Sequence, residues 1–221
     1  MSRKIQRVIL LVDSSGSMHG KPIDNVKKAV TSLAQKIDQF NSLSSRIEFQ
    51  IIAFATQAKY ISKNKVNEIV ASGRTNLADA YKKLNLIFKK HNSFDYPPII
   101  LLLCDGKPNI CNHQLALEKL NQNAAFRSSL KIAIAYGEQD SYTMQVLKDF
   151  AGTYENVLQN ESITTIKYLI ECSLPKVLKE QARSDNSNYN NLLKIIKSDA
   201  KRRDAFSKAS QRKYHAIKGS V

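Results

Sequence analysis

The sequence predicts a doubly wound α/β fold with a mostly parallel central sheet, one antiparallel edge strand and helices on both faces. Two apolar runs, 8–12 and 99–104, have the length and composition of strands buried on both faces, and an aspartate directly follows each of them. Elsewhere apolar residues recur at intervals of three and four, which is the spacing of one helix face. Strands that alternate with helices usually form a parallel sheet, so this alternation predicts the doubly wound fold.

The predicted elements follow one another in a regular order. A strand over 7–12 leads through a small polar turn into a helix that begins near Pro22, because proline favours the first helical turn. Residues 46–56 are expected to form a strand and 58–62 an antiparallel edge strand. The elements expected next are helix 77–88, strand 99–104, helix 115–126, strand 131–136, helix 144–150, strand 156–158 and helix 163–178.

The composition indicates one globular domain with a basic appendage. Hydrophobic residues make up 43% and charged residues 24% of the 221 residues, which is typical of folded proteins. Residues 1–183 are expected to form the domain, 184–190 a polar linker and 191–221 a basic helical extension. Of the formal net charge of +15, residues 181–221 carry an excess of seven, from ten Lys or Arg against three Asp or Glu.

The sequence also predicts a cytoplasmic protein without a membrane span. No run approaches the ~20 apolar residues of a spanning helix, and the first apolar run is too short for a signal peptide. Cys104, Cys111 and Cys172 are odd in number and widely spaced, which argues against a disulfide framework and favours a reducing compartment.

Oxygen-bearing side chains gather where two predicted strands end. Asp13, Ser15 and Ser17 form an Asp-x-Ser-x-Ser motif after the first strand, Asp105 follows the strand over 99–104, and Thr75 precedes a helix. Such hard oxygen donors suit Mg²⁺, with Mn²⁺ and Ca²⁺ as alternatives. Two carboxylates and three hydroxyls roughly neutralise the ion and leave one position open. We therefore expect a protein partner that presents an aspartate or glutamate to the metal.

Three motifs together resemble the metal ion-dependent adhesion site of von Willebrand factor A (VWA) domains. They are Asp13-x-Ser15-x-Ser17, Gly73-x-Thr75-Asn76-Leu77 and Cys104-Asp105-Gly106-x-Pro108. The resemblance covers about residues 5–180. It implies that Ser15, Ser17 and Thr75 ligate the metal, and that Asp13 and Asp105 do so directly or through water.

Within that superfamily the chain is most similar to bacterial TerY-like proteins of tellurite-resistance and stress gene clusters. The similarity lies in residues 12–18, 21–23, 105–108 and 133–137. It implies a cytoplasmic scaffold that sometimes acts beside a protein kinase and a phosphatase. Arg74 stands where relatives often have a second glycine, and its side chain would crowd or electrostatically tune the open face of the metal.

Other residues offer partner contacts or a function of another class. His19, Arg74 and Lys107 are candidates for contact with the partner, although a solvated loop position is the alternative for His19. The basic tail favours nucleic acid or an acidic protein face, through Lys201-Arg202-Arg203, Arg212-Lys213 and Tyr214. A solvated or self-docking tail helix is the alternative.

Enzymatic alternatives fit the sequence less well. Ser17 lacks the Gly-x-Ser-x-Gly setting of serine hydrolases and a strand-borne histidine as its base. Cys104, Cys111 and His113 hint at zinc, but no Cys-x-x-Cys pair supports it, and Cys104 is expected in the core. A metal-dependent phosphohydrolase needs a general base, which the five donors do not include. We therefore expect an interaction module and not an enzyme.

Overall fold

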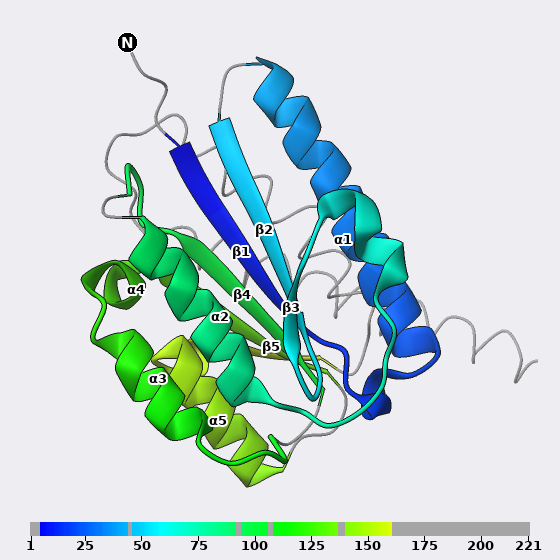
Figure 1. Ribbon diagram of the computed structural model, residues 1–221, viewed down its shortest axis with the longest axis vertical. Coiled ribbons are helices and arrows are strands. Elements are labelled where there is room, and N and C mark those ends of the chain that lie inside the picture. The colour runs from blue at the N-terminus through cyan, green and yellow to red at the C-terminus, as the bar shows by residue number, and fades with distance from the viewer. Residues whose placement is uncertain (1–4, 44–45, 92–93, 106–107, 137–139, 161–221) are drawn as a thin grey trace, which may run out of the picture.

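The chain folds around one mixed sheet, shown in the computed structural model of Figure 1, which describes residues 5–43, 46–91, 94–105, 108–136 and 140–160. The strands are β1 (Ile5–Asp13), β2 (Arg46–Phe54), β3 (Ala58–Ile61), β4 (Ile99–Cys104), β5 (Leu130–Tyr136) and β6 (Val157–Asn160). Their order is β3-β2-β1-β4-β5-β6, and every neighbouring pair is parallel except β2 and β3. The predicted fold class, with its antiparallel edge strand, is confirmed.

Helices cover both faces of this sheet (Figure 1). On one face lie α1 (Lys21–Leu43) and the 3-10 helix η2 (Lys63–Glu68). On the other face lie α2 (Leu77–Lys90), α3 (His113–Asn121), α4 (Ala124–Ser128) and α5 (Ser141–Ala151). Alternate side chains of β1 enter the two cores: Val8 and Leu10 pack with α1, and Ile9 and Leu11 with α2. Burial on both faces explains why β1 is apolar without interruption.

The structure corrects the sequence prediction in two places. The helix expected over 115–126 is two helices, because the Asn123 side chain accepts hydrogen bonds from the N–H groups of Ala125 and Phe126, at 2.9 and 3.2 Å, and starts α4. The strand expected over 46–56 ends at Phe54, and the next residues turn toward β3. The short helix η2 has no counterpart in the sequence prediction.

Several predicted features lie outside the described residues. They are Cys172, helix 163–178, linker 184–190 and extension 191–221. Within the described ranges, none of the helices combines the length and the apolar character that a membrane crossing requires.

The strand order determines where a ligand site lies. The chain passes from β1 to β2 on one side, whereas β4 adjoins β1 on the other, so the order reverses between β1 and β4. Doubly wound sheets bind their ligands at the carboxyl ends of the strands beside such a reversal. Asp13 is the last residue of β1, and Asp105 directly follows the last residue of β4. The strand order therefore brings two carboxylates to this position.

Tyr81→Phe tests whether the unpaired hydroxyl in the core destabilises the fold. The Tyr81 ring stacks on Phe150, at 5.8 Å between centroids, and its hydroxyl is buried without a hydrogen-bond partner among the described residues. Because an unpaired buried hydroxyl is costly, we expect the variant to raise the free energy of unfolding by about 1 kcal/mol in urea titrations. Tyr60→Phe, which removes a bond to the Lys83 carbonyl, is the control. A less stable Tyr81→Phe protein would contradict this prediction.

Candidate metal site

Asp13 is the buried centre of the site. Its side chain has no exposed surface (0%), and both carboxylate oxygens accept hydrogen bonds. The Ser15 N–H donates to Oδ1 at 2.8 Å, and the Cys104 thiol donates to Oδ2 at 3.1 Å. The end of β1 and the end of β4 therefore hold this carboxylate in place together.

Ser15, Ser17 and Asp105 extend the site from Asp13 toward the surface. The hydroxyls of Ser15 and Ser17 lie 3.0 Å apart, and the Ser17 hydroxyl donates to Asp105 Oδ1 at 2.9 Å. Ser15 is buried, Asp105 is half-buried and Ser17 is exposed. Four of the five predicted donors thus form one connected cluster that opens to solvent at one end.

The turn after β1 directs its serines to two sides. The N–H and the hydroxyl of Ser14 both donate to the Phe54 carbonyl, at 2.8 and 3.1 Å, which fastens the turn to the end of β2. The 3-10 helix η1 (Gly16–Met18) follows, and the buried Met18 anchors it in the core. With Ser14 directed to β2, its neighbours Asp13 and Ser15 are free to face Asp105.

Thr75, the fifth predicted donor, is attached to both loops by backbone contacts. Its N–H donates to Asn109 Oδ1 at 2.9 Å, and the Asn109 N–H donates to the Thr75 carbonyl at 3.2 Å. Two residues before it, the Gly73 carbonyl accepts from the Gly16 N–H at 3.0 Å. Thr75 is buried, and no hydrogen bond joins its hydroxyl to the described residues. Its hydroxyl therefore stays available to a ligand.

Gly73 is required by the path of this segment. Its φ of +75° is one that L side chains rarely adopt, and an added Cβ would overlap the Thr56 hydroxyl. That hydroxyl accepts a hydrogen bond from the Arg74 N–H at 3.0 Å. Thr56 and Gly73 together set the direction in which the chain approaches Thr75.

The electrostatics of the site favour a cation. Burial raises the pKa of Asp13 to about 6, although the hydrogen bonds from Ser15 and Cys104 counteract the shift; the negative charge of Asp105 adds to it. Burial likewise raises the pKa of Asp105, against the lowering effect of the Ser17 hydrogen bond. No lysine or arginine of the described residues pairs with Asp13. A buried carboxylate beside hydroxyls and a second carboxylate fits a hard divalent cation.

Of the three predicted partner contacts, two are exposed and one lies outside the described ranges. His19 directly follows η1 and is exposed, and Arg74 is exposed directly before Thr75. Lys107 lies outside the described residues. Cys104 is in the core, as expected, while Cys111 is exposed. Among the described residues, no group of three or more His, Cys, Asp or Glu is arranged to hold a metal, so zinc at Cys104, Cys111 and His113 gains no support.

Sequence reasoning missed three residues that position the donors. Asn109 joins the loop after β4 to Thr75, Thr56 supports Arg74, and the Cys104 thiol contacts Asp13. The first two act through single side-chain bonds to the backbone of a distant loop, which no periodicity reveals. The position of Cys104, at the strand end beside Asp105, was a usable signal for the third.

Comparison with known proteins shows which domain family part of the chain resembles. The sequence profile of the von Willebrand factor type A domain matches residues 8–107, which include all five predicted donors. Inter-alpha-trypsin inhibitor heavy chain H4 of Sus scrofa is 29% identical over 116 residues, which are 48% of this chain and 13% of that protein. The H4 protein of Bos taurus is 29% identical over 124 residues with the same coverage. This chain thus spans about one eighth of the length of these curated relatives.

Solved structures share the fold. Proximal thread matrix protein 1 from the mussel byssus, in a structure with a zinc-occupied metal ion-dependent adhesion site motif, has a TM-score of 0.60 at 16% identity. The superposed residues make up 79% of this chain and 46% of the mussel protein chain. The vWF domain of the type V pili tip protein Mfa5 from Porphyromonas gingivalis has a TM-score of 0.62 at 9% identity and covers 82% and 97%. At these identities the likeness shows a VWA fold.

Asp13→Asn tests the cost of the buried charge. The folded-state pKa of about 6 lies above the ordinary value of 3.8, so ionisation destabilises the metal-free fold. This penalty is absent below about pH 4 and complete above about pH 6. In EDTA at pH 7, urea unfolding of Asp13→Asn should show a free energy of unfolding roughly 2 to 3 kcal/mol above that of the wild type, with no difference at pH 4. Asp24→Asn, on the exposed first turn of α1, is the control, and a destabilised Asp13→Asn protein at pH 7 would refute the assignment.

Proposed function

We propose that this protein is a metal-dependent protein-interaction module of the VWA type and not an enzyme. Asp13, Ser15, Ser17, Thr75 and Asp105 would hold a divalent cation, and an aspartate or glutamate of a partner would complete its ligands. The main support is the Asp13 carboxylate, which is fully buried, has no lysine or arginine partner among the described residues and is connected through Ser15 and Ser17 to Asp105. When bound, the cation would attract an anionic oxygen from outside the chain.

Each donor has a distinct part in this proposal. Asp13 and Asp105 supply two negative charges, which match one divalent ion without excess. The exposed hydroxyl of Ser17 lies at the open end of the cluster, where a partner would arrive. The oxygen-only donor set favours Mg²⁺, with Mn²⁺ or Ca²⁺ as alternatives. The zinc found in the mussel protein shows that a similar motif accepts another divalent ion in that protein.

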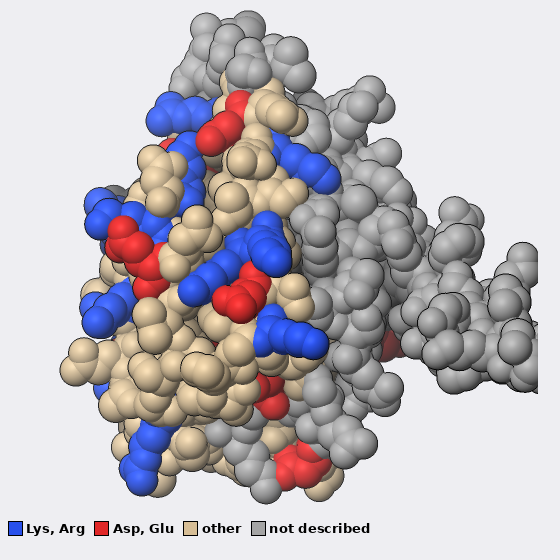
Figure 2. Space-filling view, turned by 90° about the vertical axis from the view of Figure 1, so that its right-hand side faces the viewer, with Lys and Arg blue, Asp and Glu red and all other residues tan. Residues whose placement is uncertain are grey.

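Charged side chains of both signs lie on the face of the molecule shown in Figure 2. On the side shown in Figure 2, basic and acidic side chains are interspersed over the described residues, without a continuous field of one sign. We therefore propose that the metal and its surrounding loops determine which partner binds. Long-range electrostatic attraction between the two proteins would contribute less to this choice. Resemblance of the sequence to TerY-like proteins suggests a bacterial cytoplasmic scaffold in stress response or tellurite resistance, with a kinase or phosphatase among its partners.

The experiment that tests this function combines metal binding with partner capture. Thr75→Val keeps the shape of a buried side chain and removes one hydroxyl, so isothermal calorimetry should show at least a tenfold loss of Mg²⁺ affinity. The immobilised wild type should retain a defined protein in Mg²⁺ and release it in EDTA, and Thr75→Val should retain less of it at limiting Mg²⁺. Equal capture by all samples, with folding verified by circular dichroism, would exclude the metal-dependent mechanism.

Gly73→Ala should weaken metal binding through the backbone. The added methyl group cannot coexist with the present position of Thr56, so the segment that leads to Thr75 must move. We expect at least a tenfold loss of Mg²⁺ affinity by calorimetry. Gly152→Ala is the matched control, because Gly152 also has a positive φ, of +89°, and nothing lies within 4 Å of an added Cβ. Similar affinity losses in both variants would indicate general strain and contradict a local effect.

A further inference from the structure

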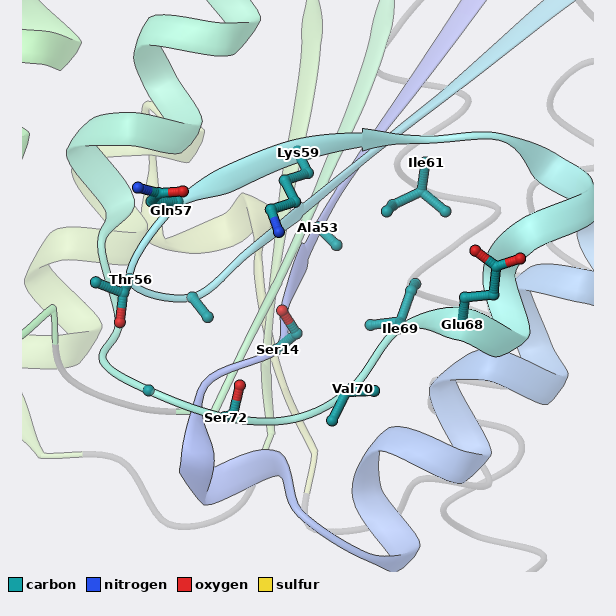
Figure 3. A pocket seen from close by; sticks show the side chains of 12 residues that line it. Ser14, Ala53, Thr56, Gln57, Lys59, Ile61, Glu68, Ile69, Val70 and Ser72 are labelled. Atoms are coloured by element: carbon teal, nitrogen blue, oxygen red, sulfur yellow. The ribbon is translucent and has the colours of Figure 1, made fainter.

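A cavity of about 440 Å³ lies directly behind the loop that carries the metal donors (Figure 3). One wall is the end of β2 with β3, and the other is the chain segment 68–73, which we call the strap. Ser14 lies on the floor of the cavity, between the proposed ligands Asp13 and Ser15. The cavity and the metal site therefore lie on opposite sides of the same loop.

Backbone hydrogen bonds connect the strap with the metal loop. The Ser72 N–H donates to the Ser14 carbonyl at 2.9 Å, and the Gly16 N–H donates to the Gly73 carbonyl at 3.0 Å. The strap then continues within two residues to Thr75. A group that fills the cavity must therefore contact the same segment that positions a metal donor.

The floor of the cavity suits an apolar occupant. The hydroxyl and the N–H of Ser14 both donate to the Phe54 carbonyl, so this residue has no hydrogen-bond donor left to offer at the floor. Ile61 and Ile69 extend toward the space from the two walls (Figure 3). Val70, also in the lining, is 71% exposed, so its side chain is accessible to a group that enters the cavity. Burial of these side chains would favour binding of an aliphatic or aromatic group.

The rim of the cavity carries one unpaired cation. Lys59 extends from β3 over the cavity (Figure 3), and no ion pair joins it to a described residue. The acidic residue of the rim, Glu68, lies 3.4 Å from Lys65 and is thus already paired. The rim therefore complements a negative charge on whatever group enters.

We propose that this cavity receives an apolar side chain of the same partner segment whose carboxylate binds the metal, and that Lys59 pairs with a second carboxylate of that segment. The inference rests on the proposed function for its first contact. The partner motif would contain two acidic residues and an aliphatic or aromatic anchor, so the chain would discriminate among the many proteins that expose one acidic residue.

Selection from a random twelve-residue peptide library tests this proposal without knowledge of the natural partner. The library is selected on the full-length protein in Mg²⁺, and each selected peptide is measured again in EDTA. Lys59→Glu alters the rim of the cavity, and Val70→Asp alters its lining. The control variants Lys89→Glu and Leu86→Asp make the corresponding charge changes at exposed positions of α2. Both pairs are checked for folding and for Mg²⁺ affinity by calorimetry.

The expected consensus has two acidic residues near an apolar one, and binding requires Mg²⁺. Lys59→Glu and Val70→Asp should each weaken these peptides at least tenfold, while the α2 variants stay within about twofold of the wild type and all four bind Mg²⁺ normally. Mg²⁺-dependent peptides that are insensitive to both cavity variants, or no selected peptide at all, would overturn this inference alone. Peptides that bind equally in EDTA and lack acidic residues would overturn the proposed function as well.

Discussion

The burial of the Asp13 carboxylate is the constraint on which the rest of the site depends. The end of a strand between two parallel neighbours excludes water, so the carboxylate needs donors from the protein. The Ser15 N–H and the Cys104 thiol donate to it, and hydrogen bonds from these two residues do not keep its pKa at the ordinary value. Within the part of the chain that the structure describes, no lysine or arginine pairs with this carboxylate, and a bound cation would neutralise its charge.

Three loops that are distant in the sequence become one site because the backbone fastens them to one another. Ser14 attaches the first loop to β2, Gly16 attaches it to Gly73, and Asn109 attaches the third loop to Thr75. These bonds join groups of the protein itself and hold the three loops against one another. Such preorganisation lowers the entropic cost of binding, because the side chains are already held in place.

The sequence predicted the central strands and the edge of the sheet at which Asp13 and Asp105 lie, because both follow from burial. Burial on both faces leaves an unbroken apolar run, and the ends of parallel strands meet at one edge, so Asp13 and Asp105 were found from strand ends alone. The break at Asn123 was missed because apolar periodicity continues across it. Asn109 and Thr56 were missed because each acts through a single bond to a loop that is remote in the sequence, and only coordinates show that pairing.

The two sides of the metal loop suggest how selectivity for a partner arises. Ser15 adopts an extended conformation, with φ −66° and ψ 169°, and in extended chain successive side chains point to opposite sides. Asp13 and Ser15 thus face the proposed metal, whereas Ser14 faces the cavity beside the strap. The donors cannot vary without loss of the cation, whereas among the described residues no hydrogen bond or ion pair joins the side chain of Lys59 or Val70 to a donor. Selectivity for a partner is therefore expected to reside in the strap and in β3, where substitution leaves the cation in place.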